Sequence, residues 1–530
     1  MSAAADAQGS GGASGRAGGR ASAGAWLAVA AGTVGALMAT LDISIVNASL
    51  PTIQGEIGAS GSEGTWISTA YLVAEIVMIA LSGWFERMLG LRTFLLIVTS
   101  AFTGFSVLCG LSSNLGQMIV GRVGQGFTGG AMIPTALTIV ATRLPPAQRP
   151  IGIALFGLTA VLGPVLGPLI GGWLTENVSW HYAFFVNLPI CVCLLSLIII
   201  GLPGEPAKPG MLASADWSGI VGLALGLGCL TTMLEEGQRE RWFESSLINT
   251  LAVVSVVGFM LVALGQWRAR EPVIQLKILF QRSFGSVFIM SLVLGGGLYG
   301  LLYLIPQFLA AVPGYNSEQS GYVVLLSGLP TLALMPFFPL LVKRVDVRLA
   351  IAFGLACYGA SCFMDMGLTP DADGGGFVWP QLLRGVGQFF SMLFLNQAAT
   401  SSVAQQFAGD ASGLFNAARN LGGSFGLAVV STMQDRRTTL HVDRIGESLT
   451  ANSPLGQSYL HTLGQALGNG DPLAGPQRAM ALFSQQVELQ ATVMAYSDLF
   501  IIFGVVLVAA IPLVLFLQPL PKGGDSTSAG

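Results

Sequence analysis

Three ionisable side chains lie inside long apolar stretches of this sequence. Asp42, in the segment LDISIVNASLP, follows residues 25–41, which are apolar or small except for two threonines. Glu75 and Arg122 also lie within apolar stretches. A charged carboxylate at the centre of a membrane costs roughly 3 kcal/mol on insertion scales, so such residues usually face a protein interior and serve a function. These side chains are therefore the first candidates for chemistry.

The depth of the three groups can be compared by counting along their helices. A rise of about 1.5 Å per residue places Asp42 roughly 12 Å, Glu75 roughly 13 Å and Arg122 roughly 9 Å below the outer helix ends. One arginine can neutralise one carboxylate, and the other carboxylate then favours its protonated form. We expect that carboxylate to exchange a proton in competition with a cationic substrate. The alternative is that Asp42 and Arg122 form a purely structural ion pair.

The composition defines the elements that position these residues. Hydrophobic residues make up 52% of the chain and charged residues 10%, against roughly 25% charged residues in soluble domains. The chain is therefore a polytopic membrane protein, and its net charge of −3 does not favour nucleic acid. Runs of about 20 apolar residues can each cross a bilayer. We predict an all-α fold with fourteen spans, near residues 26–49, 66–85, 93–112, 116–140, 150–174, 181–202, 217–235, 247–266, 286–310, 321–342, 348–368, 378–400, 411–433 and 497–518.

Lysine and arginine are concentrated on one side of the predicted spans. Short loops on the other side carry only Arg239 and Arg241. Because cytoplasmic loops are enriched in these residues, both termini are predicted to be cytoplasmic. The predicted organisation is a disordered tail (1–24), a six-helix half (25–202), two inserted helices (203–285), a second six-helix half (286–520) that includes a long periplasmic segment (434–496), and a tail (521–530).

An internal repeat supports two similar halves. The Val-Gly-Gln sequence at 123–125 recurs at 386–388, and the spacing of Gly83, Arg87 and Arg92 recurs within 339–348. Parallel six-helix halves that hold substrate between them near the midplane are one design of secondary transporters.

Several ordered motifs extend this interpretation. LDISIVNASLP at 41–51, GRVGQGFTGG at 121–130 and LGPVLGPLIGG at 162–172 resemble motifs of the major facilitator superfamily, in particular its fourteen-helix drug:proton antiporters of the EmrB/QacA type. LFNAARNLGGSFG at 414–426 also resembles the EmrB side of that group. The resemblance places the antiporter motif in the fifth span, at Gly163, Pro164, Gly167, Pro168, Gly171 and Gly172.

The resemblance implies a multi-pass protein of the bacterial inner membrane that exports lipophilic, cationic compounds in exchange for protons. The proton gradient would supply the energy, and no cofactor or metal is expected. In EmrB-like relatives a periplasmic adaptor and an outer-membrane channel complete the export path. The amphipathic pattern of QRAMALFSQQVELQATVMA, at 477–495, makes the segment 434–496 a candidate contact for such an adaptor. An exporter of a metabolite or siderophore is the alternative.

One motif departs from the family pattern. In GWFERMLGLRT, at 83–93, Gly83, Gly90 and Arg92 fit. Arg87 stands where the resemblance implies an aspartate, and Glu86 is the only nearby acid that could replace it. The cytoplasmic charge relay of the family is therefore altered in this chain.

The fifth predicted span combines small residues with prolines. Gly163, Gly167 and Gly171 are four residues apart and form one stripe that another backbone can approach closely. Pro164 and Pro168 each remove a helical N–H group and bend or loosen the helix. We expect this span to seal a leak path while it rocks, and ordinary tight packing is the alternative.

The C-terminal half offers cations but no clear acid at mid-membrane depth. Asp365 lies near an outer helix end and is interpreted as solvated. Residues that could face a cavity are Arg384, Arg419, Asn416 and Gln307. The two arginines could instead satisfy helix carbonyls or lipid headgroups.

A membrane-embedded enzyme or assembly factor is the rival from a different class. The sequence contains no HExxH and no Walker motif, so it predicts neither a zinc-protease centre of that kind nor ATP-driven export.

Overall fold

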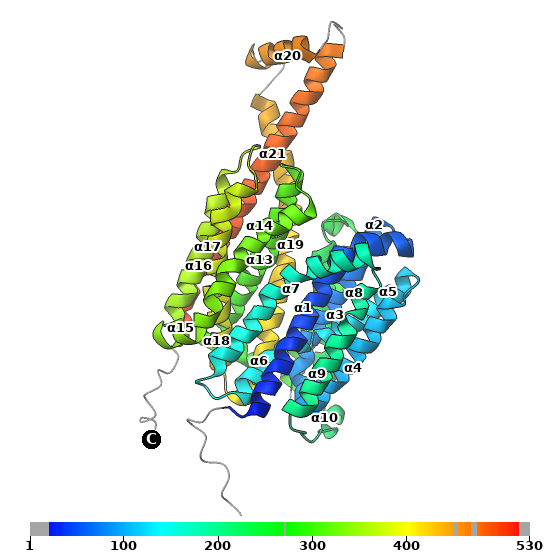
Figure 1. The fold of residues 1–530 in the computed structure, drawn as a ribbon, viewed down its shortest axis with the longest axis vertical. Coiled ribbons are helices and arrows are strands. Elements are labelled where there is room, and N and C mark those ends of the chain that lie inside the picture. The colour runs from blue at the N-terminus through cyan, green and yellow to red at the C-terminus, as the bar shows by residue number, and fades with distance from the viewer. Residues whose placement is uncertain (1–20, 270–271, 449–453, 468–473, 519–530) are drawn as a thin grey trace, which may run out of the picture.

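The computed structural model describes residues 21–269, 272–448, 454–467 and 474–518, and this part of the chain is helical without strands. Most helices run side by side in one bundle (Figure 1). Eleven helices of the described part are long and apolar enough to cross a membrane. The predicted tails at 1–24 and 521–530 lie outside the described residues, apart from residues 21–24.

The N-terminal half begins with α1 (Ala23–Ile57), which packs against α6, α7 and α9. Its other helices are α2 (Gly61–Gly64), α3 (Trp66–Leu89), α4 (Leu91–Gly110), α5 (Leu115–Gly129), α6 (Met132–Arg143), α7 (Arg149–Asn177), α8 (Tyr182–Phe185) and α9 (Asn187–Gly201). The single span predicted at 116–140 is therefore two helices that meet at 130–131. Close packing on α3 explains glycine there, because a Cβ at Gly130 would lie 2.6 Å from the Glu75 carbonyl oxygen.

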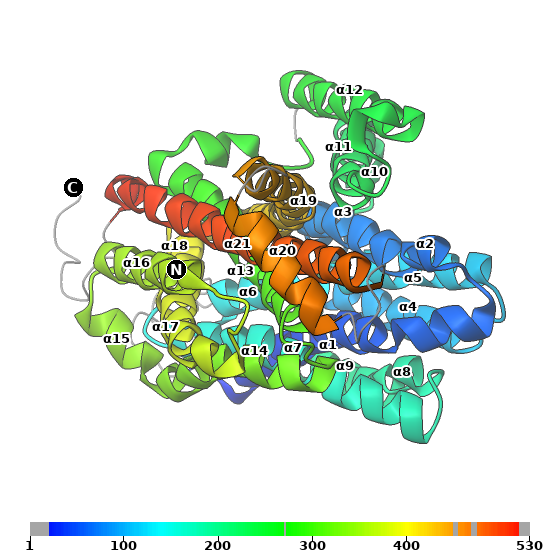
Figure 2. The same cartoon turned by 90° about the horizontal axis from the view of Figure 1, so that it is seen from above.

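Two helices follow that lie outside the main bundle. After α10 (Gly210–Ala213), α11 (Trp217–Glu236), η1 (Trp242–Glu244) and α12 (Ser246–Arg268) form a hairpin. The two long helices approach closely, since a Cβ at Gly258 would lie 2.4 Å from the Gly226 nitrogen. Only α11 also packs against α3 and α19, and Figure 2 shows α12 at the edge of the molecule.

The C-terminal half contains α13 (Arg282–Ala311), α14 (Ser317–Leu334), α15 (Phe338–Arg344), α16 (Val347–Met364), α17 (Val378–Gln388), α18 (Phe394–Ser401), α19 (Ala408–Ser448), α20 (Pro454–Leu467) and α21 (Ala474–Ala509). Short turns join them: η2 (Leu276–Phe280), η3 (Met335–Phe337), η4 (Asp365–Gly367), η5 (Gly374–Phe377), η7 (Gln405–Phe407) and η8 (Ile511–Phe516). A π-helical turn, η6 (Phe389–Leu393), interrupts the span predicted at 378–400.

Three predicted spans are not among the eleven long apolar helices. They correspond to α5 with α6, to α17 with η6 and α18, and to α19. All three pack inside the bundle, where α5 contacts α3 and α4, α17 contacts α14 and α16, and α19 contacts α13 and α3. The count of fourteen spans stays a prediction.

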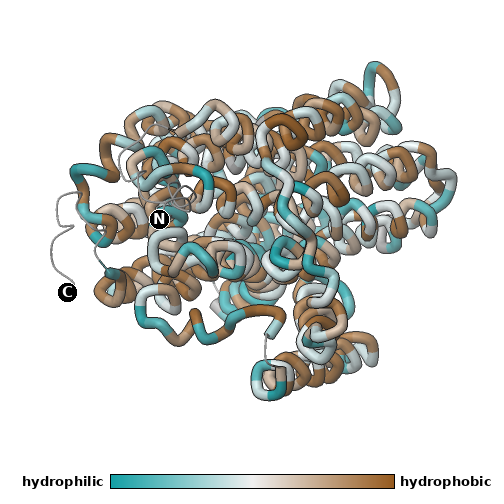
Figure 3. Tube along the Cα trace, turned by 90° about the horizontal axis from the view of Figure 1, so that it is seen from below, coloured by the Kyte–Doolittle hydropathy of each residue, from teal (hydrophilic) through white to brown (hydrophobic). Residues whose placement is uncertain are grey.

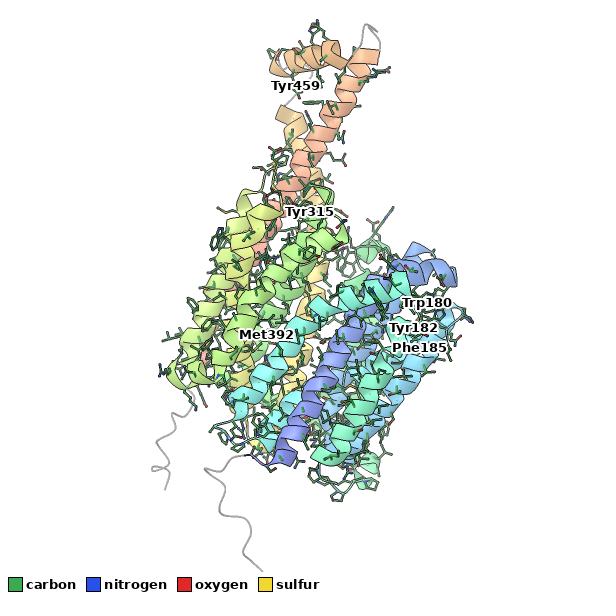
Figure 4. All side chains as sticks on the ribbon, viewed as in Figure 1. Trp180, Tyr182, Phe185, Tyr315, Met392 and Tyr459 are labelled. Atoms are coloured by element: carbon green, nitrogen blue, oxygen red, sulfur yellow. The ribbon has the colours of Figure 1, made fainter. Side chains whose placement is uncertain are left out.

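The segment predicted to be periplasmic, 434–496, forms a helical projection. The end of α19, α20 and the start of α21 extend beyond the bundle (Figure 1). Tyr459 of α20 donates a hydrogen bond to the Gln486 side chain of α21 at 2.9 Å, and Figure 4 shows Tyr459 within this projection. The amphipathic helix predicted at 477–495 continues without a break into the last predicted span, as α21.

Apolar residues run along most helices of the bundle, as the hydropathy colours of the Cα trace in Figure 3 show. On α12, Val253 and Met260 are 64% and 65% exposed. A surface of this kind suits lipid, since helices satisfy their own backbone hydrogen bonds in hydrocarbon.

The two halves are in contact at the end of the bundle opposite the projection. Ser412 of α19 donates to the Pro134 carbonyl of α6 at 2.6 Å, and Gln405 donates to the Thr142 carbonyl at 3.2 Å. The described chain also begins and ends at this side of the bundle (Figure 1). This is the side predicted to be cytoplasmic, so the contacts close the molecule there.

Candidate functional site

Asp42 and Arg122 form an ion pair inside the N-terminal half. The Arg122 Nη1 atom lies 2.6 Å from Asp42 Oδ2, and both side chains are completely buried. Arg122 comes from α5 and Asp42 from α1, two helices that also touch along their length. We expected one arginine to neutralise one carboxylate, and in the structure that carboxylate is Asp42.

Further hydrogen bonds fix this pair. The other Asp42 oxygen, Oδ1, accepts from Asn187 Nδ2 at 2.7 Å and from Gln125 Nε2 at 3.1 Å. Arg122 donates through Nε to the Ile67 carbonyl at 3.1 Å, and its guanidinium lies 4.2 Å from the centre of the Tyr71 ring. Asp42 is therefore held by donors from α5 and α9, all within one half of the molecule. Both Asp42 oxygens have donors, although Arg122 Nη2 has no partner among the described residues. A carboxylate paired in this way favours the structural interpretation.

Asn187 is a member of this cluster that the sequence analysis missed. It begins α9, 145 positions after Asp42 in the chain, and is 1% exposed. The sequence signal that could have pointed to Asn187 is a polar residue at the start of a long apolar run.

Glu75 has a different environment. Its side chain on α3 is 2% exposed, and its carboxylate makes no hydrogen bond or ion pair with any residue in the described part of the chain. The charged groups close enough to act on Glu75 are the Arg419 guanidinium of the other half, Arg122 and Asp42. Glu75 is thus the unpaired carboxylate of the layer, and one of the cations near it belongs to the other half.

Arg419 lies on α19, which packs against α3. It is 6% exposed, and its guanidinium makes no hydrogen bond or ion pair within residues 21–269, 272–448, 454–467 and 474–518. Arg419 and Glu75 are also both close enough to act on Tyr299 of α13. Among the described residues, the structure therefore places one unpaired carboxylate and one unpaired guanidinium on α3 and α19, at the boundary between the halves.

Two further acids at the end of α11 contact both halves, and the sequence analysis did not select them. Ser424 of α19 donates to Glu235 at 2.7 Å, and Thr69 of α3 donates to Glu236 at 3.0 Å. The inserted hairpin is thus joined to α3 and α19 by polar contacts near the Glu75 layer.

The interpretation of Asp365 as a solvated residue is wrong. Its carboxylate lies 2.6 Å from Arg384 Nη2, and both side chains are 2% exposed. The chain turns through η4 at the end of α16, and α21 packs over this turn. Arg384 also donates to Gln381 at 2.9 Å, so it is a paired buried cation, which favours the structural one of the two roles considered for it.

The other two candidates for a cavity each have a polar neighbour on their own helix. Asn416 is completely buried and donates to the Ser412 carbonyl of its own helix at 2.9 Å. Gln307 is half-buried on α13 beside Tyr303. Met392, on the π-helical turn, lies near α7 where the two halves meet (Figure 4).

The glycine stripe of α7 packs directly on α1. A Cβ would lie 2.6 Å from Thr40 Oγ1 at Gly163, 2.1 Å from Ser44 Cβ at Gly167 and 2.7 Å from the Ile45 carbonyl oxygen at Gly171. The neighbouring Gly172 meets nothing within 4 Å. Pro164 and Pro168 are exposed, on the side away from this contact, and α7 runs through both as one helix.

The altered motif between α3 and α4 connects the two halves. Arg87 Nη1 lies 2.6 Å from Asp410 Oδ1 at the start of α19, and Arg87 Nη2 donates to the Val273 carbonyl at 3.1 Å. Gly83 is required by this contact, because its Cβ would lie 2.9 Å from the same Asp410 oxygen. Gly90 has a φ of 75°, which favours glycine, and Arg92 follows it in the first turn of α4. The basic residue at the expected acidic position therefore finds an acid in the opposite half.

Comparison with known proteins defines the class to which this fold and these motifs belong. The Major Facilitator Superfamily profile matches residues 32–427. The chain therefore belongs to the major facilitator superfamily of membrane transporters, and the resemblance found in its motifs is confirmed.

Similar curated proteins narrow the class. The chain is 33% identical over 497 residues to the colistin resistance protein EmrB of Acinetobacter baumannii, covering 93% of this chain and 96% of that protein. It is 30% identical over 496 residues to the multidrug export protein EmrB of Escherichia coli K12, covering 93% and 95%. The fatty acid resistance protein FarB of Neisseria gonorrhoeae is 29% identical, covering 93% and 96%.

Solved structures support the fold. The human organic anion transporter MFSD10 matches with a TM-score of 0.60 at 16% identity, covering 91% of this chain and 99% of that one. The proton:xylose symporter XylE matches with a TM-score of 0.56 at 14% identity, covering 91% and 94%.

Proposed function

We propose that this chain is a proton-coupled multidrug efflux antiporter of the bacterial inner membrane that exports lipophilic cations by alternating access. Glu75 carries the proposal. It is a buried carboxylate without a partner in the described residues, and Arg419 of the opposite half is close enough to act on it. Relatives named multidrug export proteins support the choice of substrate class.

Proton coupling follows from the place of Glu75 between the halves. When the halves move relative to each other, the distance between Glu75 and Arg419 changes, and so does the balance between the charged and protonated carboxylate. A cationic substrate stabilises the charged form in the same way that Arg419 does. Substrate and proton then compete for one carboxylate, which gives exchange without a cofactor and with the proton gradient as the source of energy.

The remaining candidates act as a frame in this proposal. Asp42, Arg122, Gln125 and Asn187 hold α1, α5 and α9 together while the halves move. The flat contact of α7 on α1 excludes leaks, and the prolines of α7 face the side that is free to bend. The projection formed by α19, α20 and α21 is the surface that a periplasmic adaptor of a tripartite pump would contact.

Inside-out vesicles with an imposed pH gradient test the proposal. The collapse of the gradient is followed after addition of ethidium, for the wild type and for Glu75→Gln and Asp42→Asn at matched amounts of folded protein. We expect a response from the wild type and from Asp42→Asn, and none from Glu75→Gln. A wild-type response in Glu75→Gln would overturn the role of Glu75, and a wild type that responds to no lipophilic cation would overturn the drug assignment.

A second candidate function is the export of anionic amphiphiles, such as a metabolite or siderophore with carboxylates. Arg419 favours it, because a buried guanidinium without a partner in the described part of the chain is a ready site for an anion. The relative named for fatty acid resistance points the same way. Gradient collapse on adding decanoate, and not on adding ethidium, would select this function.

A further inference from the structure

A cavity lies on the predicted cytoplasmic side, away from the Glu75 layer. Its volume is about 700 Å³, within the roughly 300–1,000 Å³ of drug-sized ligand pockets. It is formed by the end of α3, by residues 205–215 on and around α10, by residues 272–275, and by residues 406–410, where η7 leads into α19. Glu86 and Glu75 are eleven positions apart on α3, about 16 Å along the helix. This cavity is therefore separate from the proposed transport site.

The charged groups of the cavity differ in whether they have hydrogen-bond or ion-pair partners. Its walls carry the carboxylates of Glu86, Glu205 and Asp410 against the cations of Arg87 and Lys208. Glu205 is held by Arg143 at 2.5 Å and by the Leu91 nitrogen at 3.4 Å. Glu86 makes no hydrogen bond or ion pair with any residue that the structure describes. One acid in the cavity is thus paired and another is free.

Asp410 supplies a second free acceptor. Its residue is 4% exposed, and its Oδ1 atom accepts from Arg87. The other oxygen, Oδ2, is buried without a hydrogen-bond partner among the described residues. Glu86 lies next to it, because a Cβ on the neighbouring Gly409 would meet Glu86 Oε2 at 3.2 Å. A buried acceptor with no donor costs stability unless a ligand satisfies it.

Apolar side chains complete the cavity. Trp84, which is 4% exposed, Met211 and Phe407 belong to its lining. Aromatic and thioether groups beside two free carboxylate acceptors form a surface for a molecule with one cationic and one apolar end.

We propose that this cavity binds an amphipathic organic amine, with the ammonium group between Glu86 and Asp410 Oδ2 and the apolar part against Trp84, Met211 and Phe407. The bound cation competes with Arg87 for Asp410. It therefore weakens a contact that joins α3 to α19 and keeps the cytoplasmic side closed. Binding at this site is independent of the proposed function, and only its consequence for transport depends on it.

Protection of an introduced cysteine tests the site on the full-length protein in inside-out vesicles. Met211→Cys places a thiol in the lining, and Leu212→Cys places one beside it on an exposed residue outside the lining. A membrane-impermeant maleimide labels each variant, and peptide mass spectrometry reports the rate at that position. The probe is dansylcadaverine, which carries a primary ammonium group and a naphthalene ring. The N-acetylated probe, which has no charge, is the control.

We expect dansylcadaverine to slow labelling of Met211→Cys several-fold and to leave Leu212→Cys unchanged. Glu86→Gln raises the probe concentration needed for protection by about tenfold, since the ammonium group loses the negative charge of its acceptor and keeps only a neutral amide oxygen. Glu75→Gln leaves protection unchanged, so failure of the transport proposal is seen separately. Equal protection by the N-acetylated probe, no protection at millimolar dansylcadaverine, or equal protection of both cysteines would each overturn the proposal. The first two comparisons need no substitution of Glu86, so they decide even where Glu86→Gln fails to fold.

Discussion

Asp42 and Glu75 are carboxylates buried at similar depth on α1 and α3, but only Asp42 has partners. Arg122, Gln125 and Asn187 supply three donors to Asp42, and all belong to the same half. Glu75 has no hydrogen-bond donor within the described residues, and a cation close enough to act on it lies in the opposite half. A charge that is paired inside one rigid half keeps its environment during transport, whereas a charge at the boundary between halves does not. Burial alone therefore does not identify the coupling residue.

The largest expected effect is on stability, and it separates the two carboxylates directly. Asp42→Asn leaves the buried Arg122 guanidinium without a counter-charge, which destabilises a protein by about 3–5 kcal/mol. Glu75→Gln is the matched control, because it makes the same chemical change at similar depth without breaking an ion pair. Thermal unfolding of the purified protein in detergent measures both. Equal losses in the two variants would contradict the comparison.

A double substitution sharpens this result. Arg122→Gln alone leaves Asp42 uncompensated, and we expect a loss similar to that of Asp42→Asn. The combination of both replaces a charged pair by a shorter neutral pair and leaves no uncompensated charge, so it should recover part of the stability. Additive losses in the double variant would show that the cluster is not coupled.

The second effect concerns transport. Glu75→Gln removes the carboxylate that we propose exchanges the proton, and we expect coupled exchange to fall by at least about a hundredfold, the lower end of the effect of a positioned acid–base group. Its melting temperature should stay within a few degrees of the wild type. The vesicle assay with ethidium measures the first quantity and thermal unfolding the second. A Glu75→Gln protein that unfolds early and still couples when folded would reverse the assignment of the two residues.

The third effect is a change in substrate preference. Arg419→Gln removes the free cation that acts on Glu75, so anionic amphiphiles lose their counter-charge. We expect transport of decanoate to fall about tenfold, since a charge-assisted hydrogen bond is lost, while ethidium transport changes less. Arg384→Gln is the control, because Arg384 is equally buried but paired with Asp365. If both arginine variants alter the two substrates alike, Arg419 does not contact substrate.

The sequence predicted the layer of charges and left open whether Arg122 pairs with Asp42. Depth along a helix follows from counting residues, so Asp42, Glu75 and Arg122 could be placed together without a structure. Which carboxylate the arginine chooses depends on how α1, α5 and α9 pack, and Asn187 joins Asp42 from a distant part of the chain. The family and its helical fold could be predicted because the motifs that define them are short, contiguous stretches of the sequence.

Asp365 shows the same limit in the C-terminal half. Its position near a helix end predicts solvent, because the sequence does not reveal that α21 covers that end. The electrostatic interaction between Glu75 and Arg419 also involves residues far apart in the chain. No local sequence motif around either residue predicts the other as its partner. Electrostatic partners between halves are tertiary information, and they are where the sequence-based interpretation ends.

The smallest expected effect concerns the ion pair between Arg87 and Asp410. The environment of Asp410 combines one feature of Asp42 with one feature of Glu75. Like Asp42, Asp410 is paired, but like Glu75 it meets the opposite half. Arg87 is 33% exposed, so solvent screens the pair and its loss in Arg87→Gln should cost only about 1 kcal/mol. The expected consequence is a shift in conformation rather than unfolding, with faster labelling of a cysteine introduced at Thr142, where Gln405 closes the cytoplasmic side. Exchanging the charges, as Arg87→Asp with Asp410→Arg, should restore slow labelling. If the exchange restores nothing while each single variant is folded, the contact depends on the α19 terminus and on Gly83 rather than on the ion pair.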